Sequence, residues 1–519
     1  MSRSTSKSDF DIRRSLLKLG SCGAMTNATF LSTMMHLKST SAVLAGGPSI
    51  PPDPGYKAIV CLFFNAAIDS FNVLTPHGTT QADPRYAEYV TTRTGAALKR
   101  KDLANGIDDG PWVGTDYGYL NPITDNTAGS GRVFGLHPRL PKLKQIYDNG
   151  HCAFVANTGA LVEPLLNNSD YSNAAKIKPV GLFSHPDQQR HWQTAVPTSR
   201  NQARGWAGKM ADLMTDPALM SNNVYTAIST AGQSLLLTGN RIFSYSVGAV
   251  TDNIPPINGG AIRLDGIGST SSAMDRIYNA AHTDFASQTY SDILERTIRD
   301  YRVGARDSAS TYQAAFEAAS LPTTGDQFPT SGLGSQLAAV ARSIKIASDP
   351  AAIDPLKQNR QIFLVQINGW DHHANLLSSQ NTMLPLIDNG LKAFYDFLQN
   401  SSLLNNVTLF TISDFARTWS FNGSGSDHAW GANPFVMGGA VNGGKVYGTY
   451  PNIVFNTSST GIDRGRGVII PQTSSDLYHA EICRWFGVPD SRLTDVLPNL
   501  RNFSYQGSGG HPVGFMNYT

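Results

Sequence analysis

The sequence predicts an α/β fold in which a mainly parallel sheet is flanked by helices. Three observations predict this fold. Continuous apolar runs of strand length recur along the chain, as is typical of strands buried on both faces. Stretches with helical spacing lie between several of these runs. The 519 residues are also enough to enclose a large core.

The N-terminal half contains the first two predicted strands and a helix between them. Residues 57–64, "KAIVCLFF", form an apolar run that suits a buried parallel strand. Residues 76–135 are rich in Gly, Asp, Asn and Thr and predict an extended loop. Residues 136–150 have helical spacing with a closing glycine, and residues 151–159 are the second strand. This order of elements is typical of a βαβ unit.

The middle of the chain differs from both ends. Residues 205–345 predict an α-rich insertion or cap, whose clearest helices span 290–319 and 332–348. The strand-and-helix alternation then resumes. The predicted strands span 361–367, 407–413 and 434–440, and the predicted helices span 381–400 and 474–487. The last helix has a serine at its start and a glycine at its end, which are typical capping residues.

The N-terminus predicts export. "DIRRSLLKLG" contains the paired Arg13 and Arg14 of a twin-arginine signal, and Val43 and Ala45 suit a cleavage site. The alternative is an ordinary amphipathic first helix. We therefore expect residues 1–45 to be a signal peptide recognised by the twin-arginine translocase. Residues 46–519 would then form one domain in the periplasm or outside the cell.

The composition excludes several classes of protein. Charged residues make up 15% of the chain and the net charge is +2, without the basic block that nucleic-acid binding needs. No later segment has the ~18 uninterrupted apolar residues of a membrane span. The cysteines after the signal, at 61, 152 and 483, have no paired spacing. Any metal would therefore be held by Asp, Glu and His side chains.

Acidic residues follow three of the predicted strands. Asp69 follows the first, Asp371 and His373 follow the strand at 361–367, and Asp414 directly follows the strand at 407–413. A glycine-serine loop, "NGSGSDHAWG", then presents Asp427 and His428. Ligands of open α/β sheets bind beyond the carboxyl ends of the strands. A single Asp there is usually a turn former or a helix cap, but converging carboxylates need a cation or a shared proton between them. Asp with His, without Cys, suits zinc or manganese.

These motifs resemble a known family. In order, the chain contains "FNAAIDSFNVLTPHG", "GLFSHPDQQRHWQT", "RGWAGKMAD", "NGWDHHANLLSSQ", "ISDFARTWSFNGSGSDHAWG", "FVMGGAVNGGKVYGTYP" and "GRGVIIPQTS". This set resembles the exported bacterial proteins grouped as domain of unknown function 1501, over nearly all of residues 46–519. The resemblance implies a relationship to the alkaline phosphatase and sulfatase superfamily. It therefore implies a parallel α/β core with strand-end metal ligands, and usually two metals beside a Ser, Thr or modified Cys nucleophile.

The resemblance also implies roles for individual residues. The metal ligands would be Asp69, Asp371, His373, Asp414 and His428. His372 would point away from the ion, because alternate residues of an extended segment face opposite sides. Phe415 stands where many phosphatases have a ligand histidine, so we expect the second metal to be weak or missing.

The nucleophile and the oxyanion contact are assigned with alternatives. Ser184 is the first choice of nucleophile, because a helix start favours an anion, and Thr158 is the second. Ser184 could equally be a plain helix cap. His185 would bind substrate or metal, or cap the helix locally. Arg417 would contact an oxyanion, or else form a surface ion pair.

Two functions follow from this reasoning. The first is a metal-dependent hydrolase of phosphate or sulfate esters, acting on a small-molecule or polysaccharide substrate. The alternative is a non-catalytic, metal-stabilised binding or assembly protein outside the cytoplasm with a degenerate site. An exported oxidoreductase is not favoured, because no glycine fingerprint follows the first strand.

Overall fold

A computed structural model describes the chain from residue 55 to residue 518, with internal gaps. The residues outside the description in this range are 80–82, 102, 104–105, 107, 110–116, 215–224, 248–272, 322–326, 331 and 353–355. The predicted signal peptide, residues 1–45, also lies outside the described residues. Within them, no helix is long and apolar enough to cross a lipid bilayer.

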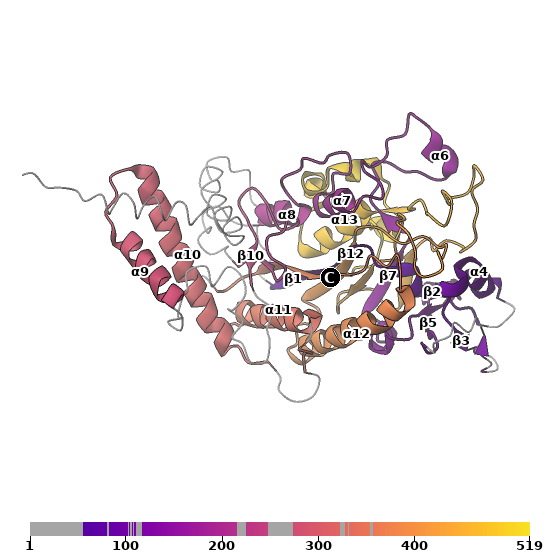
Figure 1. The fold of residues 1–519 in the computed structure, drawn as a ribbon, viewed down its shortest axis with the longest axis horizontal. Coiled ribbons are helices and arrows are strands. Elements are labelled where there is room, and N and C mark those ends of the chain that lie inside the picture. Colours follow the sequence, from indigo (N-terminus) through magenta and orange to yellow (C-terminus); the bar gives the residue numbers. More distant parts are fainter. Residues whose placement is uncertain are drawn as a thin grey trace, which may run out of the picture.

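An eight-stranded sheet lies at the centre of the described structure (Figure 1). Its strand order is β10-β9-β11-β1-β12-β13-β7-β14. All neighbours run parallel except β13, which is antiparallel to both β12 and β7. The predicted mainly parallel sheet is therefore confirmed. The strands are β1 Lys57–Phe64, β7 Cys152–Ala156, β9 Ala227–Ser229, β10 Tyr245–Ser246, β11 Arg360–Ile367, β12 Val407–Ser413, β13 Phe435–Met437 and β14 Lys445–Gly448.

Helices cover both faces of the sheet. In β1, Val60 and Leu62 face a core shared with three helices: α5 Pro141–Asp148, α11 Gly332–Ser348 and α12 Leu376–Asn400. Ile59 and Cys61 face the opposite core, shared with α8 Trp206–Met214 and α13 Ser475–Phe486. Figure 1 shows α11 and α12 on one side of the sheet and α7 (His185–Thr194), α8 and α13 on the other. Burial on both faces explains why the strand sequences are continuously apolar.

Two predicted helices show how local and distant contacts set helix ends. The Ser474 hydroxyl accepts the Leu477 amide at the start of α13, and Gly487 ends the helix with a φ of 119°. The predicted caps are therefore confirmed. The helix α12 begins at Leu376, earlier than the predicted residue 381. The reason is tertiary, because Ser424 accepts the amides of Asn375 and Leu376 through its hydroxyl and carbonyl oxygens.

The prediction of an extended loop over residues 76–135 is wrong. This segment contains the helix α4, Pro84–Arg93, which begins because Asp83 caps it and proline suits its first position. It also contributes to a three-stranded antiparallel sheet, β2-β6-β5. The strands of this sheet are too short to stand out in the sequence: β2 Leu74–Pro76, β5 Asn121–Thr124 and β6 Val133–Leu136. A further short pair is formed by β3 Arg100–Lys101 and β4 Asp108–Asp109.

The strand predicted at residues 151–159 is interrupted. Asn157 has a positive φ of 50°, which separates β7 from β8, Thr158–Gly159. The strand β8 then leaves the main sheet and pairs with β15, Thr473–Ser474. The chain thus changes sheets at Asn157.

The predicted α-rich segment at residues 205–345 contains more than helices. Besides α8 and α11 it includes α9 Ala273–Ser287 and α10 Ile293–Ala318, which Figure 1 shows beyond β10, away from the sheet centre. It also supplies the edge strands β9 and β10. Its role as an insertion or cap stays a prediction. The remaining α-helices of the described part are short: α3 Ser70–Val73, α6 Asn168–Ser172 and α14 Leu493–Val496.

Candidate metal centre

The candidate site lies where three neighbouring parallel strands end. In the sheet, β1 lies between β11 and β12, so their carboxyl ends share one edge. Asp371 and His373 follow β11, and Asp414 directly follows β12. His185 is the first residue of α7, which packs beside β12. His428 is held beside the end of β12 by antiparallel pairing with Arg417.

Three histidines converge on one carboxylate oxygen. The Oδ1 atom of Asp371 lies 3.5 Å from Nε2 of His185, 3.1 Å from Nε2 of His373 and 3.4 Å from Nε2 of His428. The Nε2 atom of His428 is also 3.2 Å from that of His185 and 3.0 Å from that of His373. The candidate ligand atoms of His185, Asp371 and His428 all lie within 4.8 Å of one another. We call these three histidines and Asp371 the candidate metal centre.

In each of the three histidines, the other ring nitrogen, Nδ1, forms a hydrogen bond with an oxygen atom of the protein. Nδ1 of His185 lies 2.6 Å from Oδ2 of Asp414. Nδ1 of His373 lies 3.0 Å from Oδ1 of Asp427, and Nδ1 of His428 lies 2.8 Å from the Phe183 carbonyl oxygen.

These partners determine the tautomers. A carbonyl or carboxylate oxygen accepts a hydrogen bond, so each Nδ1 donates, and a ring in its neutral form then directs an Nε2 lone pair inward. This is the outer-shell arrangement of metal-binding histidines. The three lone pairs and the Asp371 carboxylate repel one another unless a cation lies between them. The residues present therefore fit a divalent metal ion.

The charges around the centre favour an ionised Asp371. Burial alone would raise the pKa of this carboxyl group, but the Arg417 guanidinium bonds to it and the pKa falls below its usual value. The hydrogen bond that His185 donates to the Asp414 carboxylate raises the pKa of His185. Burial lowers the pKa of His428. The carboxylate that would bind a cation is thus ionised before any cation arrives.

Phe415 covers one side of the centre, and the other side is exposed to solvent. The buried ring of Phe415 lies 4.7 Å from the rings of both His185 and His428, measured between ring centroids. The side chains of Asp371 and His373 are 42% and 45% exposed. A ligand can therefore approach the centre from solvent.

Asp69 and Asp414 lie outside the converging group. Asp69 is fully buried, forms an ion pair with Arg93 and caps α3 through the Phe71 amide. Asp414 is also fully buried, and besides His185 it accepts the Ala66 amide at 3.2 Å. Both carboxylates are therefore committed to protein donors. The structure places Asp414 behind a ligand histidine and gives Asp69 a structural ion pair.

The predicted catalytic residues are placed differently from one another. His185 lies in the centre itself. Ser184 is at the N-cap position of α7, but its hydroxyl does not cap the helix. The Ser184 hydroxyl bonds to the Asp187 carboxylate instead. Arg200 first, and then this hydroxyl, lower the pKa of Asp187. Thr158, the second candidate nucleophile, is fully buried and donates to the Val155 carbonyl oxygen.

Arg417 is not an exposed residue. Its guanidinium is fully buried and bonds to Asp371 and to backbone carbonyl oxygens, including those of Ala67 and Ser426 at 3.0 Å each. It therefore orients the Asp371 carboxylate from the buried side of the site. His372 lies away from the centre, with its buried ring 5.8 Å from that of Trp370.

Two polar residues of the site were not predicted from the sequence. Gln189 donates to Asp414 at 3.0 Å and to Asn65 at 2.6 Å. The signal was available, since Gln189 lies four residues after His185 on α7 and so on the same helix face. Asp427 was noted beside His428, but its contact with His373 depends on a loop conformation that the sequence does not reveal.

Comparison with known proteins finds one family match. Residues 291–488 match the model of a family described as "Protein of unknown function (DUF1501)". The predicted family is confirmed over this segment, which includes Asp371, His373, Asp414, Arg417 and His428. No curated protein matches the chain.

Several solved structures show a distant likeness. One is Ps i-CgsB in complex with k-i-k-neocarrahexaose, at 10% identity and a TM-score of 0.30, covering 86% of this chain and 77% of that chain. Another is the PsFucS1 sulfatase from Pseudoalteromonas sp., at 10% identity and a TM-score of 0.29, covering 89% of this chain and 72% of that one. At such low TM-scores the α/β fold class rests on the strand order of the sheet itself.

Proposed function

We propose that this chain is an exported, metal-dependent hydrolase of phosphate or sulfate esters. One observation carries the proposal: three Nε2 atoms and one carboxylate oxygen converge at the open edge of the sheet. His185, His428 and Asp371 would hold the ion, with His373 beside them. Imidazole-rich sites with one carboxylate suit zinc best, and manganese is the second choice. A bound divalent ion polarises an ester oxygen and activates a hydroxyl or water.

The protein residues around the centre have distinct roles in this proposal. Arg417 keeps Asp371 ionised and fixes its orientation. Asp414, Asp427 and the Phe183 carbonyl oxygen hold the three histidines in the ligand tautomer. Ser184 is the proposed nucleophile because it directly precedes His185 at the start of α7, where the helix N-terminus favours an anion.

The proposed substrate class rests on exposed side chains, and the proposed location rests on the sequence. The exposed faces of Asp371 and His373 leave room for a small or a polysaccharide ester. Residues 1–45 would direct export by the twin-arginine route.

The test combines metal analysis with a panel of aryl phosphate and aryl sulfate esters. We expect the purified protein to contain a divalent metal and to turn over at least one ester. Asp371→Ala should lose both properties. Ser184→Ala should keep the metal and lose turnover by about a hundredfold or more. An Asp371→Ala protein that retains full metal content and turnover would contradict the proposal.

A second function is favoured by the burial of Arg417. This residue was the predicted contact for an oxyanion, yet its guanidinium is fully buried and bonded within the protein. The alternative is therefore a metal-stabilised binding or assembly protein. Bound metal with no turnover of any ester would favour this alternative.

A further inference from the structure

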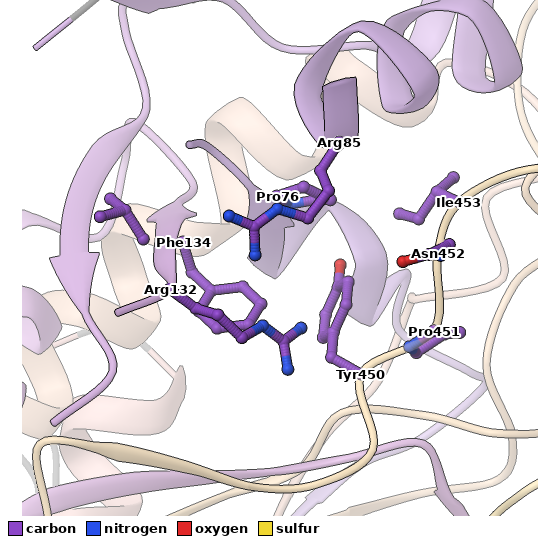
Figure 2. A pocket seen from close by; sticks show the side chains of 9 residues that line it. Pro76, Arg85, Arg132, Phe134, Tyr450, Pro451, Asn452 and Ile453 are labelled. Atoms are coloured by element: carbon purple, nitrogen blue, oxygen red, sulfur yellow. The ribbon is translucent and has the colours of Figure 1, made fainter. Parts of the chain in front are cut away.

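A pocket lined by two arginines lies away from the candidate metal centre. The pocket is between the start of α4, the strand β6 and the segment 450–453, and Figure 2 shows the side chains of Arg85 and Arg132 directed into it. Phe134 and Tyr450 form its aromatic wall. We propose that this pocket binds a tetrahedral oxyanion group, sulfate or phosphate, of a soluble ligand.

Arg85 is oriented by one carboxylate. Its Nε lies 2.9 Å from Oδ1 of Asp83, and its Nη2 lies 2.5 Å from Oδ2. Asp83 is fixed in turn, because its Oδ1 accepts the Arg85 amide at 3.0 Å as the cap of α4. This pair uses one edge of the guanidinium and leaves Nη1 for a ligand. Asp83 therefore both neutralises Arg85 and aims it.

Arg132 has no such carboxylate among the described residues. Its guanidinium carbon lies 4.6 Å from the ring centroid of Phe134 and 5.8 Å from that of Tyr450. Aromatic faces hold a guanidinium in place without removing its charge. The negative charge of Asp125 acts to raise the pKa of Arg132. However, the carboxylate of Asp125 is already bonded by Thr127, Ser130 and the Val446 amide.

The two guanidinium groups are close enough to repel each other. Burial lowers the pKa of Arg132, and the nearby charge of Arg85 lowers it further. Asp83 bonds directly to Arg85, whereas Glu88 and Asp125 act on Arg85 and Arg132 through their charge alone. An anion between them relieves their repulsion and accepts charge-assisted hydrogen bonds. The two arginines come from different elements, so a tetrahedral group, with oxygens in several directions, suits them better than a planar carboxylate.

Titration calorimetry tests this site on the chelator-treated full chain. The ligands are inorganic sulfate, inorganic phosphate and a sulfated oligosaccharide, each at matched ionic strength. We expect saturable binding with one site per chain and roughly tenfold weaker binding by Arg132→Gln. Binding of the oligosaccharide together with the free anions would indicate recognition of the oxyanion group alone. Binding restricted to the oligosaccharide would indicate that its sugar contributes.

Arg342→Gln is the matched control. Arg342 is also half-buried, packs over a ring with its guanidinium carbon 5.4 Å from the Phe316 centroid, and should leave binding unchanged. If Arg132→Gln does not fold, as judged by its thermal unfolding, Arg85→Gln provides the same test. Wild-type affinity in the arginine variants, or no saturable binding of any ligand, would overturn the proposal. Asp371→Ala should bind the anion normally, so this site is tested independently of the metal centre.

Discussion

Asp427 lies behind His373 in the candidate metal centre. Its Oδ1 is 3.0 Å from Nδ1 of His373, and its other oxygen pairs with Arg466. Because this carboxylate fixes the ring and its tautomer, Asp427→Ala should weaken metal binding. Outer-shell changes of this kind cost about 10- to 100-fold in affinity, and we expect the lower end because Asp427 is partly exposed. The measurement is a zinc titration against a competing chelator.

Asp490→Ala is the control for this residue. Asp490 also pairs with an arginine, Arg484, but it lies outside the site. Unchanged zinc affinity is expected there. Equal effects of the two substitutions would mean that Asp427 does not act through His373.

At the scale of an element, α13 carries a buried acid that costs stability at neutral pH. Asp476 is fully buried, and burial raises its pKa to about 8, from an ordinary value of 3.8. Between these two values the folded state holds a proton that the unfolded chain releases. Stability therefore falls as pH rises through this window, by up to about 1.4 kcal/mol per pH unit.

Asp476→Asn should remove this pH dependence. The variant should be more stable than the wild type by several kcal/mol near pH 8, and the difference should shrink toward zero as the pH approaches 4. Urea unfolding across this range, in chelator-containing buffer, measures it. Asp148→Asn, at an exposed position of the pair with Lys144, should show no such trend. A constant difference between Asp476→Asn and the wild type at every pH would contradict the assignment.

At the scale of the whole molecule, the sequence predicts the strands and their shared carboxyl edge better than it predicts the segments packed around them. Asp371, His373 and His428 come together because β11 and β12 flank β1, so that strand-end positions share one edge. The shared edge follows from parallel α/β topology and needs no side-chain detail, whereas the strand order comes from the structure. The bounds of β1, β12 and α11 were likewise readable from apolar periodicity.

Asp69 and Asp414 were predicted to be metal ligands, but both are bound by side chains from helices. One of these helices was not predicted from the sequence, which also did not show how the other packs. Asp69 is held by Arg93, which belongs to α4, in a segment whose composition predicted a loop. Without α4, nothing in the sequence shows that this carboxylate already has a cation. Asp414 is held by His185 and Gln189 from α7, a contact that depends on how α7 packs beside β12.

The candidate metal centre also links distant parts of the chain. His185 belongs to α7, Asp371 follows β11, and His428 lies beyond β12, so a bound ion would join three segments that only folding brings together. An ion that binds only the folded state stabilises it by mass action, by about 2.7 kcal/mol at a hundred times its dissociation constant. We therefore expect zinc to raise the thermal midpoint of the chelator-treated wild type. Asp371→Ala should lose this increase, whereas His511→Ala, which alters a histidine paired with Glu481, should retain it. An equal zinc response from Asp371→Ala and the wild type would show that the stabilising ion binds elsewhere.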